Sequence, residues 1–162
     1  MATLAWTIKM SFPLSYANKI EVLFDAKNHA PENLLRSIIS SLKKVKASNI
    51  RNDQNRITFS GGILRFVMGW NILCAISSGE ITFEKNNDKL SLNYHLKFTE
   101  MFVIVTIMVL GFMGPFIFQA RNLSPFPKII ILLFMWLWLF GGNYLLTIFR
   151  FPGFIRKMTE IN

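Results

Sequence analysis

Two stretches of the chain lack the regularly spaced polar positions of an amphipathic helix. Residues 101–118 depart from apolar side chains only at one threonine, two glycines and one proline, and residues 129–149 contain three polar members. A helix needs about 20 apolar residues to cross about 30 Å of hydrocarbon. A helix in a soluble core normally keeps one polar face, and 162 residues are too few to enclose two wholly apolar helices. The pattern therefore predicts transmembrane helices at about 101–119 and 129–149.

The segment between these helices, residues 120–128, reads ARNLSPFPK. Its two prolines remove backbone donors and fix φ, which favours a short non-helical turn. A turn of this length forces the helices to run antiparallel. Residues 100–149 are therefore predicted to form a hairpin with both chain ends on one side of the membrane.

The first hundred residues show mixed helical and strand periodicity. Residues 31–46 carry apolar side chains at helical spacing, with an acid in the first turn and lysines near the end. Strands are predicted at 8–12, 20–24, 56–62, 70–77, 80–85 and 89–98, the last with five apolar residues in strict alternation. The run 70–77 is apolar throughout and predicts a central strand. Residues 1–99 are thus expected to form an α+β domain, an antiparallel sheet of five or six strands with one amphipathic helix across a face.

The junction between domain and hairpin has no flexible linker. The last predicted strand ends at Phe98 and the first predicted span begins at Met101. Thr99 suits an N-cap, and Glu100 suits the positive end of the helix dipole. The domain is expected to sit directly on the membrane surface in a nearly fixed pose.

The distribution of basic residues predicts how the hairpin is oriented in the membrane. The net charge is +9, and Glu160 is the only acid beyond Glu100. Near the spans, Lys85, Lys89, Lys97, Arg150, Arg156 and Lys157 lie on the side of the chain ends, against Arg121 and Lys128 in the turn. The positive-inside rule then places both termini in the cytoplasm, and the start of the chain lacks the pattern of a secretory signal peptide. We expect an inner-membrane protein.

The same basic residues predict contact with membrane lipid. Anionic headgroups are a simpler partner for a chain with two spans than nucleic acid, which is not expected. The residues predicted at the membrane interface are Lys97, Arg121, Lys128, Arg150, Arg156 and Lys157. Residues 150–162 are predicted to form a basic cytoplasmic tail, anchored at the headgroups.

The sequence offers little catalytic chemistry. His29 and His95 have no metal-ligand spacing with acids or with the single cysteine, Cys74, and no cofactor motif is present. Cys74 is expected as a small apolar side chain in the strand 70–77. We expect no catalytic residue, no metal and no cofactor.

Small residues and aromatics in the two spans predict packing surfaces instead. The predicted helix-packing residues are Gly111, Gly114, Pro115, Gly141, Gly142 and Asn143. Small residues let helix backbones approach closely, and asparagine can hydrogen-bond across helices. Counted from the predicted span ends, the two clusters lie at similar depth, so they are expected to pack the hairpin on itself or against another protein. Trp136 and Trp138 form a predicted partner surface.

These features favour a non-catalytic accessory or scaffolding subunit that docks into a larger membrane protein complex. One alternative is a homo-oligomeric protein that forms a pore or senses lipid. Another is a membrane-bound enzyme with a dispersed site, for which Glu80, Glu84 and His95 would be the residues to test.

Overall fold

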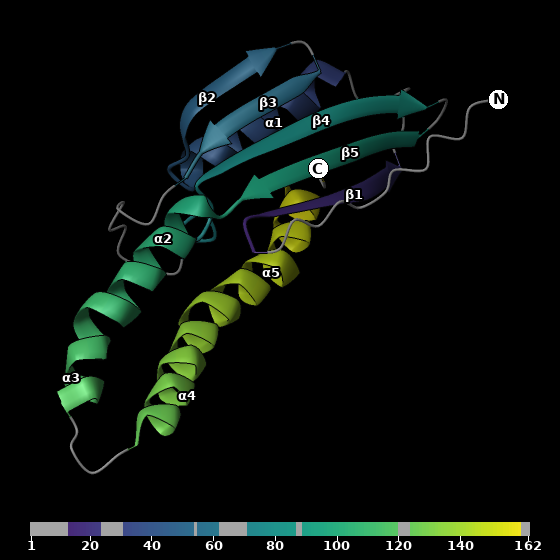
Figure 1. Ribbon diagram of the computed structural model, residues 1–162. Helices are drawn as coiled ribbons and strands as arrows, with labels where there is room; N and C mark the ends of the chain where they lie inside the picture. Colours follow the sequence, from purple (N-terminus) through teal and green to yellow (C-terminus); the bar gives the residue numbers. More distant parts are fainter. Residues whose placement is uncertain are drawn as a thin grey trace.

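The computed structural model describes residues 13–23, 31–53, 55–61, 71–86, 89–119 and 124–159. They form a five-stranded antiparallel sheet, one helix on a face of that sheet, and a long pair of apolar helices that projects from it (Figure 1). The strands are β1 (Ser15–Leu23), β2 (Ser48–Asp53), β3 (Arg56–Ser60), β4 (Ser78–Asn86) and β5 (Lys89–Lys97), in the order β1-β5-β4-β3-β2. The predicted antiparallel sheet with one helix, followed by a helical hairpin, is confirmed as a fold.

Helix α1 (Pro31–Lys44) covers one face of the sheet. Its apolar stripe, Leu34, Ile38 and Leu42, is buried together with the inward-facing residues of the strands. Alternate residues of β3 and β5 point into this core, as the strict alternation in the sequence predicted. The sheet and α1 alone do not complete the core.

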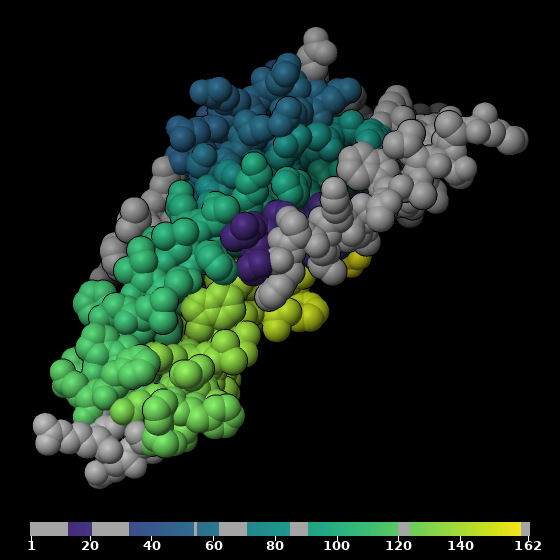
Figure 2. Space-filling view, viewed as in Figure 1, coloured from purple at the N-terminus to yellow at the C-terminus, as the bar shows by residue number. Residues whose placement is uncertain are grey.

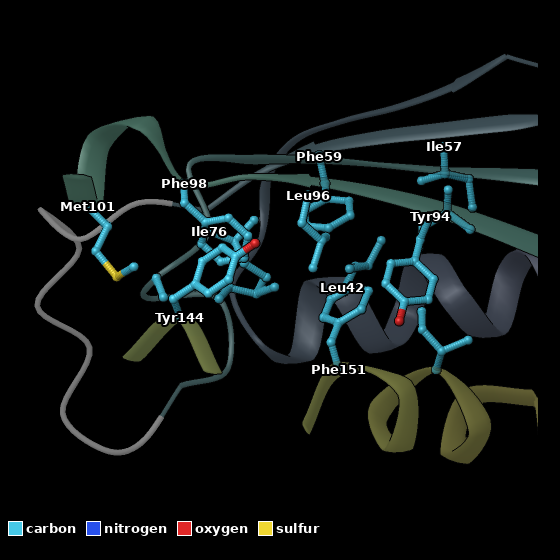
Figure 3. Packing of buried hydrophobic residues seen from close by; sticks show 14 of the residues in the cluster. Leu42, Ile57, Phe59, Ile76, Tyr94, Leu96, Phe98, Met101, Tyr144 and Phe151 are labelled. Atoms are coloured by element: carbon cyan, nitrogen blue, oxygen red, sulfur yellow. The ribbon is translucent and has the colours of Figure 1, made fainter. Parts of the chain in front are cut away.

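Side chains near the end of the second long apolar helix complete the core of the domain. Helix α5 (Gly142–Thr159) places Phe151, Ile155 and Met158 in the core, with at most 3% of each exposed. The Phe151 ring lies 5.1 Å from that of Tyr94 and 6.4 Å from that of Phe59, between the sheet and α5 (Figure 3). The Ser37 hydroxyl donates to the Met158 carbonyl oxygen at 3.1 Å, which ties α1 to α5.

Residues 150–159 are therefore part of the folded domain and not a tail. Their buried positions follow helical spacing, but they alternate with basic residues, so composition alone suggested a solvated segment. Residues 160–162 lie outside the described part of the chain.

Two other predictions for the domain were wrong. The described part of the run 70–77 forms turns, with Leu73, Ala75 and Ile76 buried beneath the sheet. Periodicity cannot distinguish a buried strand from a buried turn in so short an apolar run. Strand β2 was missed because its six residues are almost all polar and lie exposed at the sheet edge. The predicted strand 8–12 falls outside the described residues.

The first apolar helix consists of α2 (Thr99–Ile107), a π-helical stretch η1 (Met108–Met113) and α3 (Gly114–Gln119). The second runs through α4 (Pro125–Trp136), η2 (Leu137–Gly141) and α5. Pro115 has no N–H and would clash with a carbonyl one turn back, which accounts for the irregular η1 just before it. Both helices are long and apolar enough to cross a membrane, judged by length and composition, and only 22% and 17% of their most apolar windows are buried.

A single residue, Phe98, separates β5 from α2, and it is fully buried. Thr99 is not the N-cap that was predicted, because the helix makes no side-chain cap bond of its own. The Ser77 hydroxyl oxygen instead accepts a hydrogen bond from the Glu100 N–H at 2.8 Å. A residue from a distant turn thus fixes where the helix leaves the domain.

Candidate functional site

Three contacts set the register of the hairpin. The rings of Phe98 and Tyr144 lie 4.7 Å apart, and those of Phe102 and Phe140 lie 5.6 Å apart. One turn further on, the indole N–H of Trp136 donates to the Thr106 hydroxyl oxygen at 2.9 Å. Each step moves four residues up one helix and four residues down the other. Glu100 is therefore level with Gly142.

This register separates the two glycine clusters that were expected at one depth. Gly111 is level with Ile131, and Gly141 is level with Met101, so the clusters lie about 15 Å apart along the hairpin at 1.5 Å per residue. A Cβ atom built at Gly111, Gly141 or Gly142 would meet no atom within 4 Å. These glycines do not pack the two helices against each other. The prediction misplaced the clusters because it took residue 149 as the inner end of the second span.

Asn143 does not bridge the helices either. Its amide nitrogen donates to the Leu139 carbonyl oxygen of its own helix at 2.7 Å, and its side chain is exposed. Gly114 is buried, but the contact nearest to its added Cβ is in its own helix, the Val109 carbonyl at 3.9 Å. Pro115 is exposed.

Aromatic side chains fill the space between the helices. Trp136 stacks on Phe140 at 5.0 Å and meets Phe102 edge-on at 5.7 Å, while Phe140 stacks on Tyr144 at 5.8 Å. Trp136, predicted as a partner surface, is thus half-buried within the hairpin. The signal in the sequence was a run of aromatics at helical spacing, Trp136, Phe140 and Tyr144, opposite Phe98 and Phe102.

We expect Thr106→Val to weaken the hairpin, because it removes the acceptor of the Trp136 indole while keeping the side-chain volume. A hydrogen bond between apolar helices contributes about 0.6–1.7 kcal/mol. The check is the free energy of unfolding in detergent for Thr106→Val, Trp136→Phe and the double variant. A coupling energy of zero in this cycle would show that the bond does not stabilise the hairpin.

Lys128 closes the far end of the hairpin. Its side chain is 9% exposed, and its ammonium donates to the Phe118 carbonyl oxygen at 3.0 Å, with the Phe118 ring 6.0 Å away. Phe118 lies in the last turn of α3, where carbonyl groups lack helical partners and the helix dipole favours a cation. Lys128 therefore joins the end of one helix to the start of the other. Arg121 lies outside the described residues.

A second aromatic pair stays uncovered. Phe134 and Trp138 are one turn apart on the second helix, with ring centroids 6.3 Å apart and planes at 27°. Their exposed fractions are 64% and 72%. The two exposed rings form an apolar plate on the second helix. Figure 2 shows the green and yellow-green helices of the hairpin packed side by side.

The outer face of the sheet is polar. Glu80 of β4 pairs directly with His95 of β5, and its carboxylate accepts two hydrogen bonds from Arg56 at 2.7 and 2.8 Å. Glu84 is exposed further along β4, opposite Ser91.

Burial raises the pKa of Tyr94 in the core, so that hydroxyl stays protonated. No group of three or more metal-binding side chains occurs among the described residues.

A cleft lies where the domain meets the hairpin. The turn at 71–75 contributes Asn71, Cys74 and Ala75, and α5 contributes Asn143, Leu146 and Arg150. The Asn71 side chain shapes the turn, since its amide donates to the Val45 carbonyl and its oxygen accepts from the Leu73 N–H. Cys74 is half-buried in this turn and not in a strand as predicted.

The remaining predicted interface residues are exposed. Lys97 ends β5 on the outer face of the sheet, while Arg156 and Lys157 lie in the last turns of α5. Of the three basic residues of α5, only Arg150 lines the cleft.

Comparisons of the chain with protein-family models, with curated proteins and with solved structures find no match.

Proposed function

We propose that this protein is a non-catalytic integral membrane protein, an accessory or scaffolding subunit that docks into a larger membrane protein complex. The exposed plate of Phe134 and Trp138 is the observation that carries this proposal. Two helices cannot bury both an inner aromatic stack and this outer one. Tryptophan is among the residues enriched at the energetic hot spots of protein interfaces.

The apolar length of the hairpin supports insertion in the bilayer. From Met101 to Gln119, and from Pro125 to Gly142, each helix rises about 27 Å at 1.5 Å per residue, which is close to the thickness of the hydrocarbon. Between Glu100 and Arg150 the sequence has two charged side chains, Arg121 and Lys128, both near the turn. The charge bias supports an orientation with the turn outside and both ends in the cytoplasm of an inner membrane.

The packing of the sheet domain against both helices of the hairpin supports a role as a scaffold. The sheet domain is joined to one helix through Phe98 and to the other through the buried side chains of α5. A partner bound at the hairpin is thus held in a fixed geometry relative to the sheet domain. Residues 101–118 and 129–149 contain no Asp, Glu, Lys, Arg or His side chain, which disfavours the pore, since an ion path normally requires such residues within the spans.

The test is mild-detergent extraction from the native membrane followed by native mass spectrometry. We expect heterologous membrane proteins to accompany the wild-type chain and to be lost from the Phe134→Ala/Trp138→Ala variant. Phe116→Ala is the matched control, because Phe116 is 74% exposed on the other helix. We expect it to retain the partner.

Three outcomes contradict the proposal. A discrete homo-oligomer without a heterologous partner favours the self-assembling alternative. Equal partner loss in the control shows that the plate has no special role. Release of the wild-type chain by alkaline carbonate shows that it is not integral to a membrane.

A further inference from the structure

The cleft between the turn at 71–75 and α5 combines features that a lipid headgroup requires. Its α5 wall presents Asn143, Leu146, Thr147 and Arg150, which share one helix face at spacings of three, four and seven residues. The opposite wall includes the apolar Ile72 and Ala75. A cation therefore lies at one end of a partly apolar groove, with a carboxamide two turns away.

The register of the hairpin places this cleft in the headgroup layer, an argument that rests on the membrane insertion proposed above. Glu100 is level with Gly142 and marks the inner edge of the apolar stretch on the first helix, whereas apolar side chains on the second helix continue to Phe149, directly before Arg150. Arg150 is eight residues beyond Gly142, about 12 Å along the helix at 1.5 Å per residue. Helical side chains lean toward the helix N-terminus, which here means toward the bilayer. The guanidinium is thereby brought back toward the level of lipid phosphates.

The chemistry of the cleft favours a phospholipid over other occupants. A guanidinium matches two phosphate oxygens in a planar, bidentate arrangement, and it stays charged at any working pH. Asn143 uses one N–H on the Leu139 carbonyl, and a carboxamide has a second donor and an acceptor oxygen to offer. An exposed carboxamide next to hydrocarbon is stabilised by a polar partner, such as the glycerol and ester groups below a phosphate.

We propose that this cleft binds one anionic phospholipid, with its phosphate on Arg150 and its glycerol region beside Asn143. The acyl chains then continue along the apolar surface near Leu146, which is 44% exposed. The lipid fills the angle between the domain and the hairpin, so it stabilises the joint that holds the two parts in one pose.

The experiment uses the full-length chain purified in mild detergent. Native mass spectrometry and thermal unfolding are followed during titration with dioleoyl phosphatidylglycerol, with dioleoyl phosphatidylcholine, or with inorganic phosphate alone. We expect one phosphatidylglycerol per chain, a rise in unfolding temperature with that lipid, and a smaller rise with phosphatidylcholine. Arg150→Gln is expected to bind phosphatidylglycerol at least about tenfold more weakly, because it loses the charge-assisted hydrogen bonds to the phosphate.

Two further variants identify the cleft as the site. Arg156→Gln removes the same charge from the same helix outside the cleft, and we expect it to bind the lipid as the wild type does. Leu146→Trp fills the groove without changing charge, and we expect it to lower the affinity for both lipids. Equal weakening by Arg156→Gln, or wild-type binding by Arg150→Gln, overturns the proposal. Stabilisation by inorganic phosphate equal to that by the lipid also overturns it, because the occupant is then not a lipid.

Alkaline carbonate extraction separates this proposal from the proposed function. If the Arg150→Gln chain stays in the membrane fraction and binds the lipid as the wild type does, the lipid site in the cleft is refuted but the proposed function is not. If carbonate releases the wild-type chain from the membrane, both the lipid site and the proposed function are refuted.

Discussion

Replacing Phe151 by alanine is expected to lower the free energy of unfolding by about 3–5 kcal/mol, the usual effect of truncating a buried aromatic ring. Phe151 is fully buried between the sheet and α5, in contact with the rings of Phe59 and Tyr94. Because whole domains are stable by only about 5–15 kcal/mol, a loss of this size removes a large share of the total stability. The measurement is thermal or denaturant unfolding of the purified full-length chain.

Phe149→Ala is the matched control. It removes the same ring two residues earlier in the same helix, where the side chain is 77% exposed. Surface substitutions usually change stability by less than about 0.5 kcal/mol. Equal effects of the two variants would show that residues 150–159 form a solvated tail and that the packing of α5 described above is wrong.

Gly61→Ala is the second substitution with a large expected effect. A Cβ atom at this position would overlap the Ile76 carbonyl oxygen and lie 2.6 Å from that of Leu73. Both obstacles are backbone atoms, so no side chain can rotate away. The turn at 71–77 must shift, and overpacking of this kind costs about 1–3 kcal/mol or more.

The shift also reaches the hairpin, because the same turn carries Ser77, which caps α2 through the Glu100 N–H. We expect a lowered unfolding temperature together with faster amide exchange in the first turn of α2. Gly153→Ala is the control, since an added Cβ there meets nothing within 4 Å in a helix. Alanine is favoured over glycine in helices by about 0.5–1 kcal/mol, so this variant should be neutral or slightly stabilising. If Gly61→Ala unfolds at the wild-type temperature, the close approach at residue 61 is not a constraint.

Several features of the fold followed from local pattern. The stripe of Leu34, Ile38 and Leu42 predicted α1, and the alternation through Leu92, Tyr94 and Leu96 predicted β5 and its buried face. Unbroken apolar stretches predicted the two long helices. These signals are readable because a repeated spacing reports which face of an element leaves water. The prolines misled, however: Pro125 and Pro127 were expected in a non-helical turn but lie in the first turn of α4, where a proline needs no backbone donor.

Contacts between distant residues decided what periodicity could not. The register of the hairpin depends on which aromatic ring contacts which. The pairing of Phe102 with Phe140 places Gly142, and not residue 149, level with the start of the first helix. That register separates the two glycine clusters along the hairpin and places Asn143 beyond the level of Glu100. The capping of α2 by Ser77, 23 residues away in sequence, was hidden for the same reason.

By itself, the sequence determined the elements that repeat a spacing: the amphipathic helix, the alternating strands and the two apolar helices. Only the tertiary structure decided that residues 150–159 complete the core, that the turn at 71–77 lies beneath the sheet, and that a cleft forms beside Arg150. The physical reason is that a side chain's own spacing shows whether it can be buried, whereas the partner that buries it is chosen by the packing of the whole chain.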